Sequence, residues 1–191
     1  MQPRAIRFVL PVLALALFTL VGFSPGSGTA LAADGGPARS QATTVVTYDA
    51  GGAAEFGDVV RRATGIWNEH LSNVEFEAVD GSADVVILAD DGWPRARPTG
   101  LGTGTVWMGR QAVEEGHDPT RIAAHELGHI LGLPDRRTGV CEELMSGHSA
   151  GTDCTSATPN AAEVAEVERN FSADVFLPLG THVYGEPTPA P

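Results

Sequence analysis

Basic residues are scarce in this 191-residue chain, which has 12 Lys and Arg against 24 Asp and Glu and a formal net charge of −12. Nucleic acids and anionic membrane surfaces are bound through clusters of Lys and Arg, so this composition argues against both as partners. No internal repeat is visible, and the length suits one domain with a core of its own. We therefore expect an acidic, monomeric, single-domain protein.

Cysteine is also rare, because Cys141 and Cys154 are the only two in the chain. Zinc sites built on cysteine usually contain closely spaced pairs, which these two residues do not form. In an exported protein, such a pair predicts a disulfide that closes the loop between them. Cysteine ligation of a metal is the weaker alternative.

Only one long apolar run occurs, from Phe8 to Phe23, and two arginines precede it. With a small-residue cleavage site after it, this run is typical of a secretory signal peptide over residues 1–33. A membrane anchor is the alternative, but Pro11 interrupts the run and no second apolar stretch follows. We expect residues 34–42 to form a short leader or flexible segment, and the mature protein to be extracellular without membrane contact.

Residues 43–171 alternate between strand-like and helix-like hydrophobic patterns. Strands are predicted over 43–48, 74–79, 84–89 and 101–108, and a loop over 90–100. Helices are predicted over 54–73, from Asp118 or Pro119 to Gly132, and over 161–171. Because glycines interrupt 101–108, we expect that strand to be bent or exposed at a sheet edge. The pattern predicts an α+β domain with a twisted, mixed and mostly parallel sheet of four to five strands, followed by a proline-containing tail over 172–191.

The stretch His125-Glu126-Leu127-Gly128-His129 carries the chemistry of the chain, together with Asp135. Residues four apart share one face of a helix, so both imidazoles can reach one ion. A carboxylate from Asp135, returned toward the helix after its end, completes three ligands and leaves one position of a tetrahedral zinc open for water. Glu126 lies beside such a metal without occupying it and can take a proton from the water. The motif predicts a zinc hydrolase, and among hydrolases a peptidase.

Three alternatives stay open at this point. The histidines can be buried, hydrogen-bonded residues of an amphipathic helix without a metal. The third ligand can be Glu163 or Glu166 of the last helix in place of Asp135. The protein can also be a binding or inhibitory module that keeps zinc without turnover, although a structural zinc site has no use for Glu126.

Leu144-Met145-Ser146-Gly147 follows Asp135 and lies between the two cysteines. Taken alone, Met145 is a core residue; in this position, its adaptable apolar side chain suits a floor beneath the imidazoles. With these residues in order, the chain from about 43 to 171 resembles the snapalysin family, small secreted zinc endopeptidases of the metzincin clan. The resemblance rests on Asp118-Pro119-Thr120-Arg121, on the motif with aspartate as its last ligand, on the Met-turn and on the cysteine pair.

The resemblance implies zinc on His125, His129 and Asp135, Glu126 as the catalytic residue, and a disulfide between the cysteines. It further implies a calcium ion near Asp118 and Thr120. It also implies that the substrates are proteins or peptides, which are cleaved on the amino side of aromatic residues. An extended substrate would pair with an edge strand around residues 100–106.

Two features depart from this family pattern. His148 stands just past the Met-turn, where the family is glycine-rich, and we expect it to reach the cleft as a substrate contact. The tail from Ser172 is the second departure, because the family ends soon after its last helix.

Overall fold

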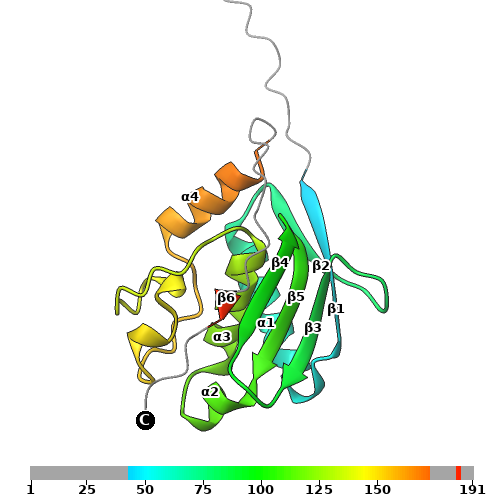
Figure 1. Ribbon diagram of the computed structural model, residues 1–191. Coiled ribbons are helices and arrows are strands. Elements are labelled where there is room, and N and C mark those ends of the chain that lie inside the picture. Colours follow the sequence, from blue (N-terminus) through cyan, green and yellow to red (C-terminus); the bar gives the residue numbers. More distant parts are fainter. Residues whose placement is uncertain (1–42, 173–183, 186–191) are drawn as a thin grey trace, which may run out of the picture. The chain divides into compact units, whose positions relative to one another are not determined.

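The structure is a computed structural model that describes residues 43–172 and 184–185 (Figure 1). All of these residues fall in one unit of the chain, Arg39–Pro191. The expected signal peptide over 1–33, the leader over 34–42 and most of the tail over 172–191 lie outside the described residues. Within the described part of the chain, no helix is long and apolar enough to cross a membrane.

The strands form one mixed sheet in the order β2-β1-β3-β5-β4-β6. Their bounds are β1 Thr44–Gly52, β2 Val74–Ala78, β3 Val85–Asp90, β4 Arg95–Gly100, β5 Thr103–Gly109 and β6 Tyr184–Gly185. The pairs β1/β2, β1/β3 and β3/β5 are parallel, whereas β4 runs antiparallel to both β5 and β6. The predicted α+β fold with a mixed, mostly parallel sheet is confirmed, and the two-residue β6 adds a sixth strand to it.

The prediction for residues 90–108 is wrong in two respects. Residues 95–100 form strand β4 instead of a loop, and β5 lies inside the sheet instead of at its edge. The buried side of β4 offers only Ala96 and Pro98, which are poor strand formers. The cross-strand partner of Arg95 is Trp107, and the Arg95 guanidinium lies 4.6 Å from that ring. A cation–π contact between strands is a tertiary interaction that strand periodicity cannot reveal.

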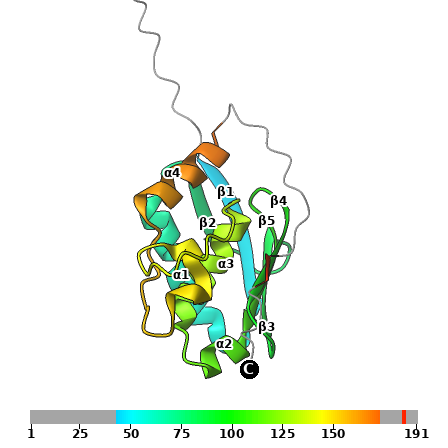
Figure 2. The ribbon, with the colours of Figure 1, turned by 60° about the vertical axis from the view of Figure 1, so that its left-hand side comes forward.

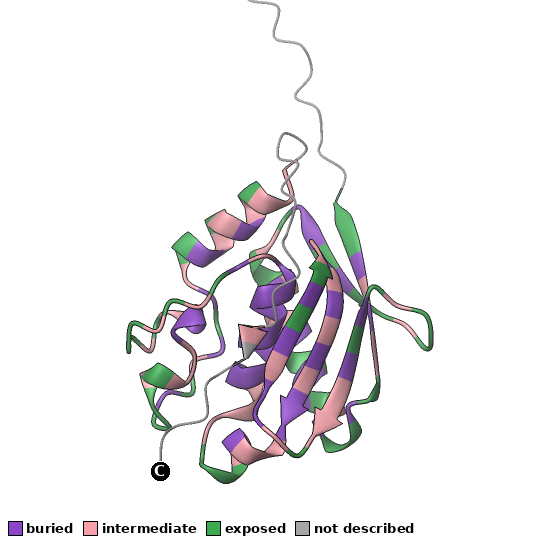
Figure 3. Ribbon diagram, viewed as in Figure 1, coloured by how far each residue is buried: buried purple, intermediate pink, exposed green. Residues whose placement is uncertain are grey.

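Two helices cover one side of the sheet (Figure 2). These two helices are α1 Gly57–His70 and α3 Pro119–Ile130. The other helices are α2 Arg110–Glu114 and α4 Ala161–Asn170, and 3₁₀ turns lie at η1 Ala54–Phe56 and η2 Leu144–Ala150. Trp67 of α1 is fully buried, and its indole Nε1 donates a 2.9 Å hydrogen bond to the carbonyl oxygen of Ala124 in α3. This hydrogen bond connects α1 to α3. The core residues come from these two helices and from the strands of the sheet (Figure 3). The motif helix is therefore held by core packing along its length.

Candidate metal and active site

Helix α3 positions both motif histidines, and its start has a local cause. The Asp118 carboxylate accepts a 2.8 Å hydrogen bond from the Arg121 amide, and Pro119 occupies the first helical position. The predicted helix start is thus confirmed. His125 and His129 lie one turn apart with ring centroids 4.7 Å from each other, and both are buried.

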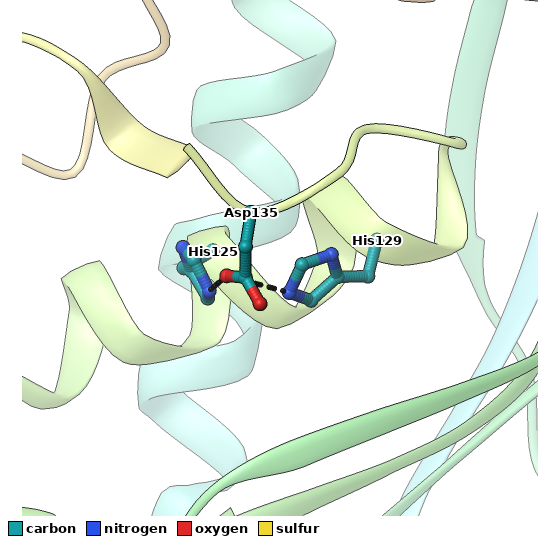
Figure 4. A group of neighbouring side chains, drawn as sticks. All are labelled: His125, His129 and Asp135. Carbon is teal, nitrogen blue, oxygen red and sulfur yellow. Dashed lines mark ion pairs between the residues drawn. The ribbon is translucent and has the colours of Figure 1, made fainter. Parts of the chain in front are cut away.

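The end of α3 turns the chain back toward these rings. Gly132 has a positive φ of 88°, its amide bonds to the His129 carbonyl, and the next amide bonds to Gly128, which is the pattern of a glycine-ended helix. Asp135 follows three residues later, and its Oδ1 atom lies 3.3 Å from His125 Nε2 and 3.5 Å from His129 Nε2. Figure 4 shows this carboxylate between the two imidazoles. The structure therefore brings together the three side chains that the motif predicted as ligands, with their ligand atoms within 4.8 Å of one another.

The hydrogen bonds of the rings define which nitrogen faces the centre. His125 Nδ1 lies 3.0 Å from the Leu144 carbonyl oxygen, and His129 Nδ1 lies 2.8 Å from that of Leu133. Because a carbonyl only accepts, each Nδ1 donates, and in the neutral ring Nε2 then carries a lone pair. Both Nε2 atoms face Asp135.

The pKa values of His129 and Asp135 both lie below their ordinary values. Burial lowers the pKa of His129 and outweighs the opposing effect of Asp135. Burial raises the pKa of Asp135, but its interactions with His125 and His129 lower it more, so its net pKa lies well below the ordinary range. The Nε2 atoms of both rings and Oδ1 of Asp135 thus converge on one point, which is an arrangement that a shared cation would stabilise. The donor set fits zinc.

Glu126 is 1% exposed and follows His125 on α3. It lines a pocket with His125, in which Trp93, Ala112, Ile122 and His148 also take part. The cavity volume of this pocket is about 30 Å³. His148 lines the same pocket as His125, and its ring meets Trp93 edge-on at 6.1 Å.

The Met-turn lies directly against α3. Met145 is fully buried, and a Cβ atom built on Gly128 would come within 2.7 Å of its sulfur, so glycine is needed for this approach. The turn also supplies the Leu144 carbonyl that orients His125. A residue outside the metal ligands thereby helps to set the ring orientation.

The downstream glutamates are occupied elsewhere. The Glu163 carboxylate is 2% exposed and accepts hydrogen bonds from the amides of Leu144 at 3.2 Å and Met145 at 2.8 Å. It also accepts one from the Asn160 amide at 2.8 Å, which completes a capping box at the start of α4. Glu166 pairs with Arg136. Neither glutamate joins the histidines, and Glu163 instead ties α4 to the Met-turn.

The predicted disulfide between Cys141 and Cys154 is confirmed. Arg121 lies beside this disulfide and is only 5% exposed. The family resemblance includes Arg121, but the sequence predicts no role for its side chain. Its guanidinium donates to the carbonyl oxygens of Cys141 at 3.1 Å, Glu143 at 2.8 Å and Ser156 at 2.5 Å. Arg121 thus connects the motif helix to the disulfide loop.

Arg137 is a second residue that sequence reasoning missed. Its Nη2 donates to Asp135 Oδ2 at 3.0 Å, and its Nη1 lies 3.1 Å from His148 Nδ1. The backbone of Arg137 has a positive φ of 49°, which is unfavourable for a side chain with a Cβ. The sequence gives little indication of this role, because Arg137 follows Asp135 by two residues and Arg136 stands between them.

Asp118 and Thr120, expected from the resemblance to hold calcium, lie at the start of α3. The Asp118 carboxylate caps this helix, and the Thr120 hydroxyl accepts a 3.4 Å hydrogen bond from Arg62 Nη2. Both residues line a shallow hollow that also includes Arg61 and Arg62. Two arginines nearby make this hollow less attractive to a cation than the two residues alone suggest.

Comparison with known proteins places this site in context. Residues 42–173 match the family model described as the Streptomyces extracellular neutral proteinase (M7) family. The extracellular small neutral protease of Streptomyces sp. (strain C5) is 40% identical over 134 residues, which cover 69% of this chain and 58% of that protein. The protein of the same name from Streptomyces caespitosus is 40% identical over 127 residues, covering 65% of this chain and 95% of that protein. The chain thus spans little more than half the length of the first relative and nearly all of the second.

Among solved structures, archaemetzincin from Methanopyrus kandleri matches with a TM-score of 0.44 and 15% identity, covering 70% of this chain and 98% of that one.

Proposed function

Because the chain belongs to the Streptomyces extracellular neutral proteinase (M7) family, we propose that it is a secreted zinc-dependent endopeptidase. The observation that carries this proposal is the convergence of His125 Nε2, His129 Nε2 and Asp135 Oδ1, with Glu126 on the same helix. In this proposal the three side chains hold the zinc and Glu126 serves as the base. Secretion is supported by the extracellular relatives and by the signal-like segment at residues 1–33.

His125, His129 and Asp135 would hold the zinc ion, which would supply a bound water of lowered pKa and polarise the substrate carbonyl. The Glu126 carboxylate takes the proton of the attacking water and delivers it to the leaving amine as the peptide bond breaks. The Leu144 and Leu133 carbonyls keep the imidazoles in the ligand tautomer throughout, and Arg137 holds the outer oxygen of Asp135.

The pocket beside Glu126 supports a preference for an aromatic residue on the amino-group side of the cleaved bond. Its walls include the Trp93 ring and the apolar side chains of Ala112 and Ile122. An aromatic side chain would meet Trp93 and gain from ring packing. His148 lies at the same pocket and is proposed as a substrate contact. The strand that an extended substrate would join is β4, since the earlier assignment to residues 100–106 falls on the turn and on the interior strand β5.

Incubation of the purified mature protein with unfolded casein, with and without a zinc chelator, tests the proposal. We expect cleavage that the chelator abolishes and added zinc restores. If neither the isolated protein nor a zinc-reloaded sample cuts casein, the endopeptidase proposal fails and the non-catalytic binding module becomes the better interpretation. Asp135→Ala tests the ligand set separately, and zinc retention close to that of the wild type would contradict the role of Asp135.

A calcium ion at Asp118 and Thr120 remains a prediction from the resemblance alone. It is tested by thermal unfolding of the protein in calcium, in magnesium and in a calcium-selective chelator. A rise of the melting temperature with calcium that Thr120→Val removes would support the site. Equal melting temperatures in all three solutions would contradict it.

A further inference from the structure

The C-terminal segment returns to the metal site. Strand β6 pairs antiparallel with β4, with Tyr184 opposite Ala96 and Gly185 opposite Arg95 (Figure 1). The Tyr184 ring stacks on the His129 ring, with centroids 4.4 Å apart and planes inclined by 10°. One residue of the tail thus occupies both the edge of the sheet and one face of a metal-facing imidazole.

Strand β6 pairs with backbone groups of β4 that an extended peptide could also use. Without β6, strand β4 would be the outermost strand on this side of the sheet, since its other neighbour is β5. An outermost strand presents unpaired backbone amides and carbonyls to any extended chain that approaches. Strand addition at such an edge is also how an extended peptide would bind next to the histidines. The tail and a substrate therefore require the same backbone groups of β4.

We infer that strand β6, at Tyr184, normally occupies the β4 edge and competes with extended peptides for this surface. We call β6 the resident strand. The inference rests on the proposed function, because it concerns entry to the same site. It assigns to strand β6 the role of an intramolecular competitor. Substrate enters when this strand leaves, and the Tyr184 ring then uncovers His129.

The contact is suited to reversible competition and unsuited to permanent closure. Paired strands this short are marginal on their own, so the stack of Tyr184 on His129 contributes a large share of the attachment. Removing one aromatic stack of this kind should shift the equilibrium between attached and released tail about two- to tenfold. Peptide affinity should rise by the same factor, because the released state is the one that binds.

The test uses metal-free, full-length mature protein and a fluorescein-labelled extended decapeptide with phenylalanine at its centre. Fluorescence anisotropy gives its Kd for the wild type, for Tyr184→Ala and for the matched variant Tyr184→Phe. We expect about two- to tenfold tighter binding by Tyr184→Ala. Tyr184→Phe keeps the stack and should bind as the wild type does. Equal or weaker binding by Tyr184→Ala would overturn the inference.

Amide hydrogen exchange provides a second measurement that does not depend on a ligand. The β4 amide that points toward β6, in the stretch Arg95–Ala96, should exchange faster in Tyr184→Ala than in the wild type and Tyr184→Phe, while the buried helix α3 stays unchanged. Unchanged exchange at β4 would also count against a resident strand. Casein turnover by the zinc-loaded wild type is read separately: its absence contradicts the proposed function, whereas the anisotropy and exchange ratios decide the role of the tail.

Discussion

Arg137 Nη2 lies 3.0 Å from Asp135 Oδ2, while the other oxygen of the same carboxylate faces His125 and His129. In the proposed zinc site, the guanidinium therefore holds Asp135 by its outer oxygen and leaves the inner oxygen for the metal. Partners of this kind orient ligating carboxylates in metal sites. Arg137 pays for this position with a backbone in the left-handed region, at a φ of 49°.

Arg137→Ala should weaken zinc binding about tenfold, at the low end of what such outer partners contribute. The low end is expected because removal of a positive charge partly offsets the lost orientation of Asp135. Competition with a fluorescent zinc chelator measures the affinity. Arg136→Ala is the matched control, since Arg136 pairs with Glu166 and not with a ligand. Equal zinc affinity of Arg137→Ala and the control would contradict the positioning role.

Arg137→Gly separates the side chain from the backbone. Glycine adopts the left-handed region without the roughly 1 kcal/mol or more that a side chain costs there. Arg137→Gly should therefore bind zinc as weakly as Arg137→Ala but unfold at a higher denaturant concentration. If Arg137→Gly is no more stable than Arg137→Ala, the strain assigned to this residue is absent.

Glu126→Gln should keep zinc and lose turnover. The amide has nearly the same shape as the carboxylate but cannot accept a proton from water, so kcat/KM should fall about 10²- to 10⁴-fold. Zinc content is measured by elemental analysis, and peptide cleavage by a quenched fluorogenic substrate. Glu115→Gln, on the short segment before α3 and exposed, is the surface control. Turnover by Glu126→Gln within a few-fold of that control would rule out the proposed base.

The parts of the site that the sequence could predict are those set by local chemistry. The start of α3 follows from Asp118 and Pro119, and its end from Gly132, within a few residues of the histidines. Helical spacing then places the two imidazoles on one face, whatever the rest of the fold does. The position of Asp135 near the histidines was predictable because the turn at Gly132 reverses the chain only three residues before it.

The parts that escaped prediction depend on residues far apart in the sequence. Strand β4 is stabilised by its pairing with β5 and by Arg95 over Trp107, a contact that exists only after the hairpin has formed. Arg136 and Arg137 look equivalent as neighbours, yet one reaches α4 and the other reaches Asp135. Arg121 lies in a helix whose hydrophobic pattern does not reveal the four carbonyl oxygens to which its guanidinium donates. Such choices are made by tertiary structure.

Ala112→Leu should change which side chain the pocket accepts. Ala112 is 1% exposed and lines the pocket, so a longer side chain takes up space there. The ratio of kcat/KM for a phenylalanine peptide to that for the matching alanine peptide should fall about tenfold or more. The alanine peptide is the internal control for general damage, and the melting temperature reports overpacking. An unchanged ratio would show that this pocket does not select the aromatic residue.

Glu163→Gln tests whether the buried glutamate is structural, as its hydrogen bonds to Leu144, Met145 and Asn160 indicate. A neutral amide turns a donor toward some of these amides, so charge-assisted bonds are lost in a buried place. We expect a loss of about 3 kcal/mol in the free energy of unfolding, measured with urea on metal-free protein. Glu166→Gln on the same helix should cost less than about 1 kcal/mol, because it breaks only an ion pair near the surface. Folded Glu163→Gln should still bind one zinc ion, because Asp135 supplies the carboxylate ligand. A stable variant that has lost its zinc would contradict a purely structural role of Glu163.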